Sequence, residues 1–164
     1  DGNVYVTTVG HVRVYTPEGD LLRTWGWTGS GPGLLGDVLG IAVSGDEVYV
    51  VDNTTHRIVV YTRTGNFLRE IDGATDSNGN IVVPFTDLRE IAVDRIGFLF
   101  LIDYAGQQLL KLTPEGVLVT AIAEPGWVNP WSFEVAIDRA GNVYTNYSDG
   151  WNSGILRYAP RPSK

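Results

Sequence analysis

The stretch of residues 48–61 constrains the fold of this chain more than any other part of it. Two short runs of apolar residues, rich in valine and each carrying a tyrosine, flank a polar connection. Runs of this length and composition are typical of β-strands and are too short for a helix. Asp52 and Asn53, at the start of the connection, are suited to bond their own backbone in a tight turn. The stretch therefore predicts a β-hairpin.

Weaker copies of this hairpin recur along the chain. The aromatic residue of the first hairpin strand returns at spacings of 44, 51 and 44 residues, at Tyr5, Tyr49, Phe100 and Tyr144. Each copy is part of a unit of roughly 45 residues that contains four short strands, which we call a, b, c and d. Sheets that are apolar on both faces must be covered by neighbouring sheets. The repeat therefore predicts an all-β fold, a β-propeller of four-stranded antiparallel blades.

The second repeat resembles the NHL repeat in the residues of its hairpin. Asp52, His56, Arg57 and Tyr61 stand at the spacing D-x-x-x-H-R-I-x-V-Y, with Ile-Ala-Val before the hairpin and Thr-Gly-Asn-Phe after it. The third repeat is a more moderate match, and the first and fourth are degenerate. The resemblance implies a propeller of about six blades. It also implies a binding platform, although some relatives are lyases or lactonases.

We expect a single propeller segment over residues 1–164, divided into blades at 1–37, 38–87, 88–131 and 132–164. The first blade lacks its strand a and the fourth lacks its strand d. These two gaps do not complement each other within one blade, so we expect an incomplete part of a ring. Further blades of a longer chain, or a neighbouring subunit, would complete it. A self-contained ring of four blades is the alternative.

The alternation of antiparallel strands assigns the connections to two faces. The long connections, residues 26–39, 72–89, 123–133 and 147–154, fall on one face, which we call the long-loop face. Binding residues gather on long loops carried by a rigid scaffold, and tryptophan is enriched where partners bind. The candidate binding residues are therefore Trp27, Trp127, Trp131 and Trp151. The alternative is that these rings cover the loops of their own blades.

Two glutamates form the candidate metal site. Glu90 and Glu134 occupy equivalent places just before strand a of adjacent blades, near the expected mouth of the central channel. Carboxylate oxygens are ligands for Ca²⁺, and the resemblance places a metal in this region in relatives that hydrolyse lactones. Gly40 stands at the matching place in the second repeat and offers no ligand. A solvated pair of acids is the alternative. Asp52 and Arg57 are expected to form an ion pair or to cap their loop.

Charge and composition exclude several classes of partner. The net charge is −7, with 12 Lys and Arg against 19 Asp and Glu, so a nucleic acid or an anionic membrane surface is a poor partner. No apolar run approaches the ~20 residues that a membrane span needs. The two glycosylation patterns, at Asn53 and Asn146, matter only in a secreted protein. An extracellular or cell-surface location is the expectation.

These observations predict a non-enzymatic binding or scaffolding module without a cofactor. Its tryptophan-bearing face would meet a protein or a glycan, or the chain would be a structural subunit of a larger assembly. The alternative is a metal-dependent lactonase or lyase of the same propeller type, with a cation such as Ca²⁺ at the channel mouth. That alternative depends on Glu90 and Glu134 alone.

Overall fold

The computed structural model describes residues 2–123, 134–148, 151 and 153–159, and this part of the chain contains strands and no helix. No helix that could cross a membrane is therefore found among the described residues. The strands are β1 (Val4–Thr8), β2 (His11–Tyr15), β3 (Leu21–Trp25), β4 (Val38–Ser44), β5 (Glu47–Asp52), β6 (Arg57–Thr62), β7 (Phe67–Ile71), β8 (Gly73–Thr75), β9 (Ile81–Pro84), β10 (Leu88–Val93), β11 (Leu99–Asp103), β12 (Gln108–Leu112), β13 (Leu118–Ala123), β14 (Val135–Ile137), β15 (Val143–Ser148) and β16 (Ser153–Tyr158).

Four antiparallel sheets follow one another along the chain. The first sheet is β1-β2-β3, the second is β4-β5-β6-β7, the third is β10-β11-β12-β13 and the fourth is β14-β15-β16. In each sheet the spatial order of the strands is their order in the sequence, because every connection is a hairpin. The prediction of an all-β fold made of small antiparallel sheets is confirmed.

The hairpin predicted from residues 48–61 is β5-β6. Its register pairs Tyr49 with Val60 and Asp52 with Arg57, so the polar connection begins and ends at this charged pair. His56 closes the turn in the left-handed region, with φ of 52°. The third sheet repeats the arrangement, with Asp103 paired with Gln108 and with Gln107 at φ of 50°.

One element was not predicted. Residues 72–89 were expected to form a long connection, but the structure folds part of them into the two-stranded sheet β8-β9. Ala74 and Phe85, at the two sides of this hairpin, are buried in the core between the second and third sheets. Thr75 also forms a parallel bridge with Val117 at the start of the third sheet's outer strand. The hairpin thus fills the outer part of the space between these two sheets.

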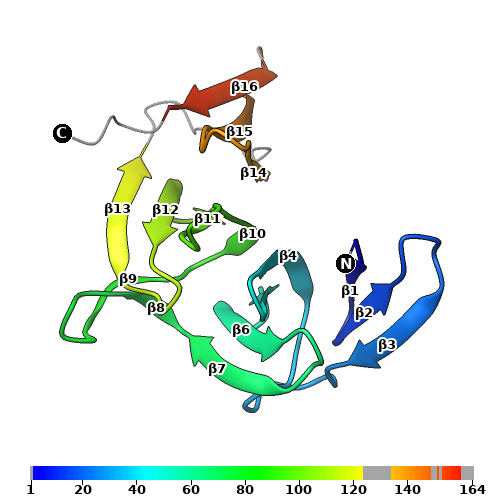
Figure 1. The fold of residues 1–164 in the computed structure, drawn as a ribbon. Helices are drawn as coiled ribbons and strands as arrows, with labels where there is room; N and C mark the ends of the chain where they lie inside the picture. The colour runs from blue at the N-terminus through cyan, green and yellow to red at the C-terminus, as the bar shows by residue number, and fades with distance from the viewer. Residues whose placement is uncertain (1, 124–133, 149–150, 152, 160–164) are drawn as a thin grey trace.

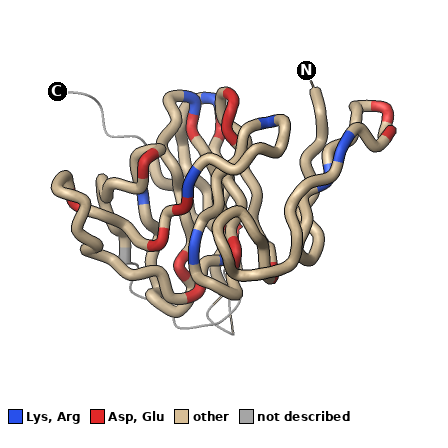
Figure 2. The backbone as a smooth tube through the Cα atoms, turned by 90° about the horizontal axis from the view of Figure 1, so that it is seen from below, with Lys and Arg blue, Asp and Glu red and all other residues tan. Residues whose placement is uncertain are grey.

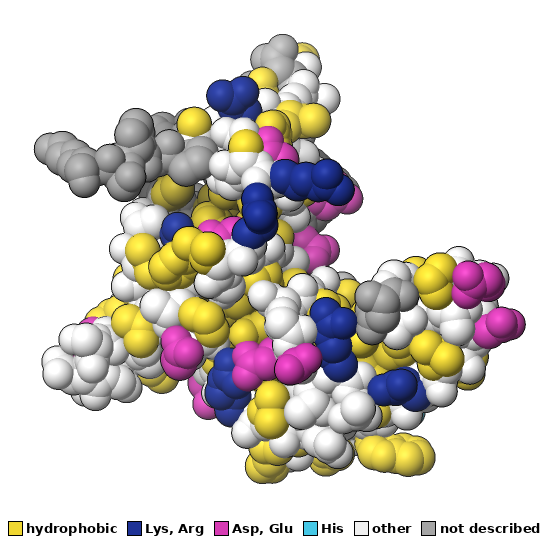
Figure 3. Space-filling view, in the orientation of Figure 1, with side chains coloured by type: hydrophobic (Ala, Val, Ile, Leu, Met, Phe, Trp, Pro, Cys, Tyr) yellow, Lys and Arg dark blue, Asp and Glu magenta, His cyan; other side chains and the backbone are white. Residues whose placement is uncertain are grey.

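The four sheets are arranged as an arc (Figure 1). Their first strands β1, β4, β10 and β14 lie on the concave side, and β4 contacts both β1 and β10. The ring is not closed in the described part of the chain. The space-filling view shows an open notch between the first sheet and the fourth (Figure 3). Acidic and basic residues are interspersed along the sheets, and the view in Figure 2 shows no surface that carries basic residues alone.

The core consists of three layers, one between each pair of neighbouring sheets. Alternate residues of a strand face opposite sides, so β5 and β6 send Val48, Val50 and Val59 toward the first sheet and Tyr49 and Val51 toward the third. A second layer holds Leu99, Leu101, Leu110 and Leu112 of β11 and β12. A third layer, which includes Leu109, lies between the third and fourth sheets. Since each central sheet is buried on both faces, no sheet here is stable without its neighbours.

Candidate functional site

Trp27, in the connection between β3 and β4, is one of two exposed tryptophans among the described residues. Its side chain is 73% exposed, and Val9, in the β1-β2 turn, is 71% exposed. The ring of His11 meets the Trp27 ring edge-on, with 5.8 Å between centroids. We call Val9, His11 and Trp27 the Trp27 patch. It brings two connections of one face together and exposes apolar area that a protein surface usually hides.

The loop that carries Trp27 is closed on itself and on the first sheet. The N–H of Leu35 donates to the carbonyl of Trp27 at 2.9 Å, and the N–H of Gly29 donates to the carbonyl of Leu35 at 3.0 Å. The N–H of Gly10 donates to the carbonyl of Gly36 at 3.1 Å. Leu35 is fully buried and anchors the loop in the core. Trp27 is therefore an exposed ring on a backbone held by several hydrogen bonds.

A buried arginine of the second sheet holds the other side of this loop. Arg57 Nη2 donates to the carbonyls of Gly31 at 3.1 Å and Leu34 at 2.9 Å. Its Nη1 pairs with Glu70 Oε1 at 2.9 Å, and Glu70 in turn accepts the N–H of Gly33 at 3.2 Å. Loop carbonyls and strand carboxylates therefore share one guanidinium. The planar fork of arginine suits such a many-partner site.

Asp52 completes this network from the end of β5, as a residue with no exposed surface. One carboxylate oxygen accepts the N–H of Gly36 at 3.2 Å and the hydroxyl of Thr55 at 2.8 Å, and the other accepts the N–H of Thr54 at 3.1 Å. Its distance to Arg57 Nη2 is 3.6 Å. Asp52 thus both caps its turn and pairs with Arg57, so both of the expected roles are present.

Of the other candidate tryptophans, the structure describes Trp151, which lies apart from this patch. Trp151 is 95% exposed, but it belongs to the β15-β16 connection, at the far end of the arc from the β3-β4 connection (Figure 1). Trp127 and Trp131 lie outside the described residues. Trp25, which belongs to β3, is buried between the first and second sheets and contacts Tyr5 and Tyr61. Among the described residues, the candidate binding tryptophans are therefore Trp27 and Trp151, two exposed side chains that lie apart from each other.

The two candidate metal ligands lie on neighbouring inner strands or next to them. Glu90, in β10, is partly buried, and its Oε1 accepts the N–H of Ile91 at 3.0 Å. Burial raises the pKa of the Glu90 carboxyl above its ordinary value, and the nearby charge of Glu134 raises the pKa further. Glu134 is exposed just before β14, and its N–H donates to Asn146 Oδ1 at 3.1 Å. The described residues contain no group of three or more His, Asp or Glu side chains that could hold a metal ion.

Gly40 faces Glu90 from the second sheet. A side chain at Gly40 would place its Cβ 2.9 Å from Glu90 Oε1, so the glycine leaves room for that carboxylate. Both Gly40 and Glu90 lie where the register of the inner strand shifts, between Val38 and Ile41 and between Leu88 and Ile91. Irregular pairing of this kind re-aims side chains and is common next to functional sites.

A comparison of the sequence with family profiles identifies the repeat. The profile of the NHL repeat matches residues 35–61, which cover β4, β5 and nearly all of β6. The chain carries an NHL repeat. The matched segment begins at Leu35 and includes Asp52 and Arg57, so the NHL repeat contains both the anchor of the Trp27 loop and the charged pair that holds it. No curated protein matches the sequence.

Solved structures extend the likeness from the NHL repeat to the whole fold. A streptogramin B lyase has a TM-score of 0.64 at 13% identity, over 98% of this chain and 52% of that one. A luciferin-regenerating enzyme has a TM-score of 0.66 at 13% identity, over 98% and 59%. The glutaminyl cyclase of Myxococcus xanthus has a TM-score of 0.64 at 14% identity, over 87% and 62%. This chain therefore spans 52–62% of these propellers, and identities this low show the fold alone.

Sequence reasoning placed Trp27 on the correct kind of loop but missed its neighbours. His11, at the start of β2, contacts the Trp27 ring, and this contact was not predicted. Glu70 was also missed as a partner of Arg57. The sequence did contain a basis for predicting this contact. The β1-β2 and β3-β4 connections are expected on the same face of the sheet, which brings residues 9–11 close to residues 26–37.

Proposed function

We propose that this NHL-repeat chain is a non-enzymatic binding module that meets a protein partner at the Trp27 patch. The observation that supports this most is an exposed tryptophan on a loop held by buried hydrogen bonds and an ion pair. A rigid contact residue loses little conformational entropy when it binds, and tryptophan is among the residues that contribute most to binding energy. The scaffold supplies that rigidity through Arg57.

A protein is favoured over a glycan by the chemistry of the patch. Val9 and Trp27 offer aliphatic and aromatic surface on two connections that are joined by a backbone hydrogen bond, which suits the apolar centre of a protein interface. Binding of a sugar needs, besides a ring to stack on, several polar side chains aimed at its hydroxyls. Trp151, at the other end of the arc, would be a separate contact for the same partner or a different one.

The proposal is tested by photo-crosslinking in the full-length protein. A photoreactive residue at Thr28, which is exposed next to Trp27, should form an adduct with a protein partner in source cells. The same residue at Thr64, an exposed position in the β6-β7 turn, is the matched control and should form none. Trp27→Ala should lower the yield at Thr28 by about tenfold without changing the melting temperature, as expected for a contact residue that carries ~1.4 kcal/mol or more.

Two outcomes would contradict this proposal. One is equal crosslinking from Thr28 and Thr64, which would mean that the long-loop face has no special role. The other is an unchanged yield at Thr28 in the folded Trp27→Ala variant. Binding to a glycan array that is lost in Trp27→Ala, without any protein adduct, would move the proposal from protein to sugar.

A second candidate function is a metal-dependent lactonase or lyase of the propeller type. The observation that favours it is the pair Glu90 and Glu134, since burial and the neighbouring charge raise the pKa of Glu90 and a cation would relieve both effects. In this case the full-length protein should bind Ca²⁺ stoichiometrically in equilibrium dialysis. Glu90→Gln should abolish that binding, and Glu115→Gln, in an exposed turn, should retain it. Absence of bound metal in the full-length protein would remove this candidate.

A further inference from the structure

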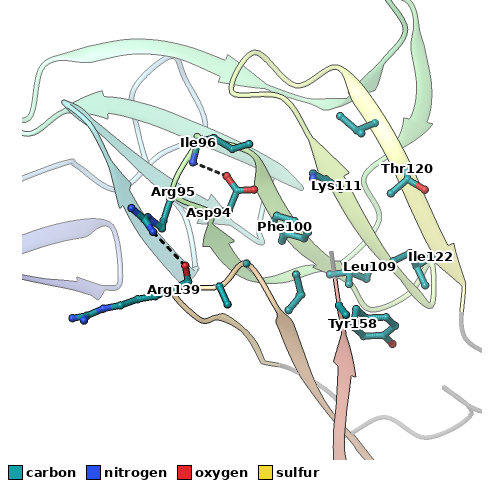
Figure 4. Close-up of a pocket in the computed structure, with 15 residues that line it drawn as sticks. Asp94, Arg95, Ile96, Phe100, Leu109, Lys111, Thr120, Ile122, Arg139 and Tyr158 are labelled. Carbon is teal, nitrogen blue, oxygen red and sulfur yellow. Dashed lines mark hydrogen bonds between the residues drawn. The ribbon is translucent and has the colours of Figure 1, made fainter. Parts of the chain in front are cut away.

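A groove of about 920 Å³ separates the third sheet from the fourth. Its walls include Phe100 and Leu109 of the third sheet, Ile122 of β13, and Val143 and Tyr158 of the fourth sheet (Figure 4). In the neighbouring layer, the β8-β9 hairpin fills the corresponding space between the second and third sheets with Ala74 and Phe85. The groove is thus a hollow between the third and fourth sheets, whereas packed side chains fill the space between the second and third sheets.

A lysine stands in this groove at a position that is apolar in the two preceding sheets. Lys111 pairs with Phe100 across β11 and β12. The residues at the same register are Val14, which pairs with Tyr5, and Val60, which pairs with Tyr49. Both valines are buried, at 1% and 0% exposed, whereas Lys111 is only partly buried. A lysine therefore stands where the first two sheets have a core valine. The groove beside Lys111 lacks the side chains that cover Val14 and Val60.

The ammonium of Lys111 lies over two aromatic rings and has no carboxylate partner among the described residues. Its Nζ is 4.2 Å from the centroid of Phe98 and 5.2 Å from that of Phe100. Asp94 also lines the groove, but its Oδ1 accepts the N–H groups of Ile96 and Phe98, and it forms no ion pair with Lys111. A partly buried cation beside apolar walls is stabilised by an anion that enters with it.

The rim of the groove adds a second positive charge, so Lys111 and Arg95 stand against one lining acid, Asp94. Arg95 Nη1 donates to the carbonyl of Arg139 at 3.4 Å and links the β10-β11 and β14-β15 turns. The Arg139 side chain extends away from the groove, so the cations that face it are Lys111 and, at the rim, Arg95 (Figure 4). Dark blue side chains gather where these two sheets meet, although the whole chain is acidic (Figure 3).

We propose that the groove between the third and fourth sheets binds a small organic anion, with its carboxylate or sulfonate at Lys111 and its apolar body against Leu109, Ile122 and Tyr158. The volume lies within the range of roughly 300–1,000 Å³ in which small-molecule sites fall. Apolar walls with one convergent charged group are also the composition of such sites. This site is separate from the Trp27 patch and does not depend on it, because it belongs to the other end of the arc.

The test uses 2-naphthoate as the anionic probe and 2-naphthamide as its neutral counterpart of similar shape. In two-dimensional NMR titrations of the full-length protein, naphthoate should shift the amide signals of Lys111, Thr120 and Ile122 in a saturable way. Naphthamide should bind at least about tenfold more weakly, because it lacks the charge that pairs with Lys111. Raising the salt concentration should weaken the binding of naphthoate only.

Three variants make the test specific. Lys111→Val, which restores the residue of the first two sheets, should reduce naphthoate affinity to that of naphthamide while the protein stays folded. Lys111→Arg should retain the preference for the anion. Arg13→Val removes one exposed positive charge from the first sheet and should change the affinity by less than about twofold, since surface charges that far away are screened.

Several outcomes would overturn the proposal. Equal affinity for both probes would leave an apolar groove without an anion site. An unchanged naphthoate affinity in Lys111→Val would place the charge recognition elsewhere, as would shifts confined to signals outside the groove. Binding of an acidic leucine-rich peptide in the absence of naphthoate binding would show that the groove serves a macromolecule instead of a small anion.

Discussion

Replacing Arg57 with alanine is expected to lower the free energy of unfolding by about 3–5 kcal/mol, the range for breaking a buried ion pair by removing one partner. The substitution leaves Asp52 fully buried without its cation. It also removes the Arg57 donor from the Leu34 carbonyl and leaves the Gly31 carbonyl with the N–H of Leu34 alone. Total stabilities of small domains are about 5–15 kcal/mol, so the loss would be large. Urea-induced unfolding followed by tryptophan fluorescence measures it.

Two further substitutions serve as comparisons for Arg57→Ala. Arg57→Gln introduces the residue that the third sheet uses at this place, where Gln108 Nε2 donates to Asp103 Oδ2 at 3.4 Å. It should recover part of the loss because a glutamine amide can form with Asp52 the bond that Gln108 forms with Asp103. Arg13→Ala, on an exposed face, should change stability by no more than about 0.5 kcal/mol. If Arg57→Ala is as mild as Arg13→Ala, the buried network does not hold the loop.

The second large effect is expected at Gly65, in the turn between β6 and β7. Its φ is +93°, and a Cβ there would lie 2.7 Å from ring atoms of Trp25 in the preceding sheet. Gly65→Ala therefore combines backbone strain of about 1–2 kcal/mol with overpacking of about 1–3 kcal/mol. We expect a combined loss of roughly 2–5 kcal/mol in the free energy of unfolding, measured in the same urea experiment.

The chain contains a matched control for this effect. Gly19 has nearly the same φ, +96°, but no atom lies within 4 Å of the position of its Cβ. Gly19→Ala should therefore lose only the free energy that corresponds to backbone strain. The difference in the free energy of unfolding between Gly19→Ala and Gly65→Ala then measures the contact between neighbouring sheets. Gly116 should behave like Gly65, because its Cβ would lie 2.6 Å from Ile71 Cγ2. Equal losses at Gly19 and Gly65 would contradict close packing of Trp25 on this turn.

The local elements of the fold could be predicted because they depend on neighbouring residues. The β5-β6 hairpin follows from two runs of valine around Asp52, and the turn glycines follow from their need for positive φ. The stacking of sheets followed from the repeat, since its central strands, such as β5 and β11, are apolar on both sides. The aromatic Tyr49 and its counterparts fixed the period to within a few residues.

Contacts between distant parts of the chain could not be predicted. The place of residues 72–89 between two repeats predicts a connection, although β9 is an apolar run, and Ala74, Val83 and Phe85 reach the core through contacts with distant residues. Arg57 meets Glu70 and the loop carbonyls through tertiary packing that no spacing reveals. Lys111 breaks the apolar pattern of its strand, but its place in a groove depends on how the third and fourth sheets meet.

The central claim is that small sheets stack face to face through Trp25 and its counterparts. Nuclear Overhauser contacts in the full-length protein test it most directly. The structure predicts contacts from the Trp25 ring to the Gly65 Hα and to the Tyr61 ring, whose centroid is 6.4 Å away. Contacts of Trp25 confined to its own strand and to β2, with none to the second sheet, would contradict the account.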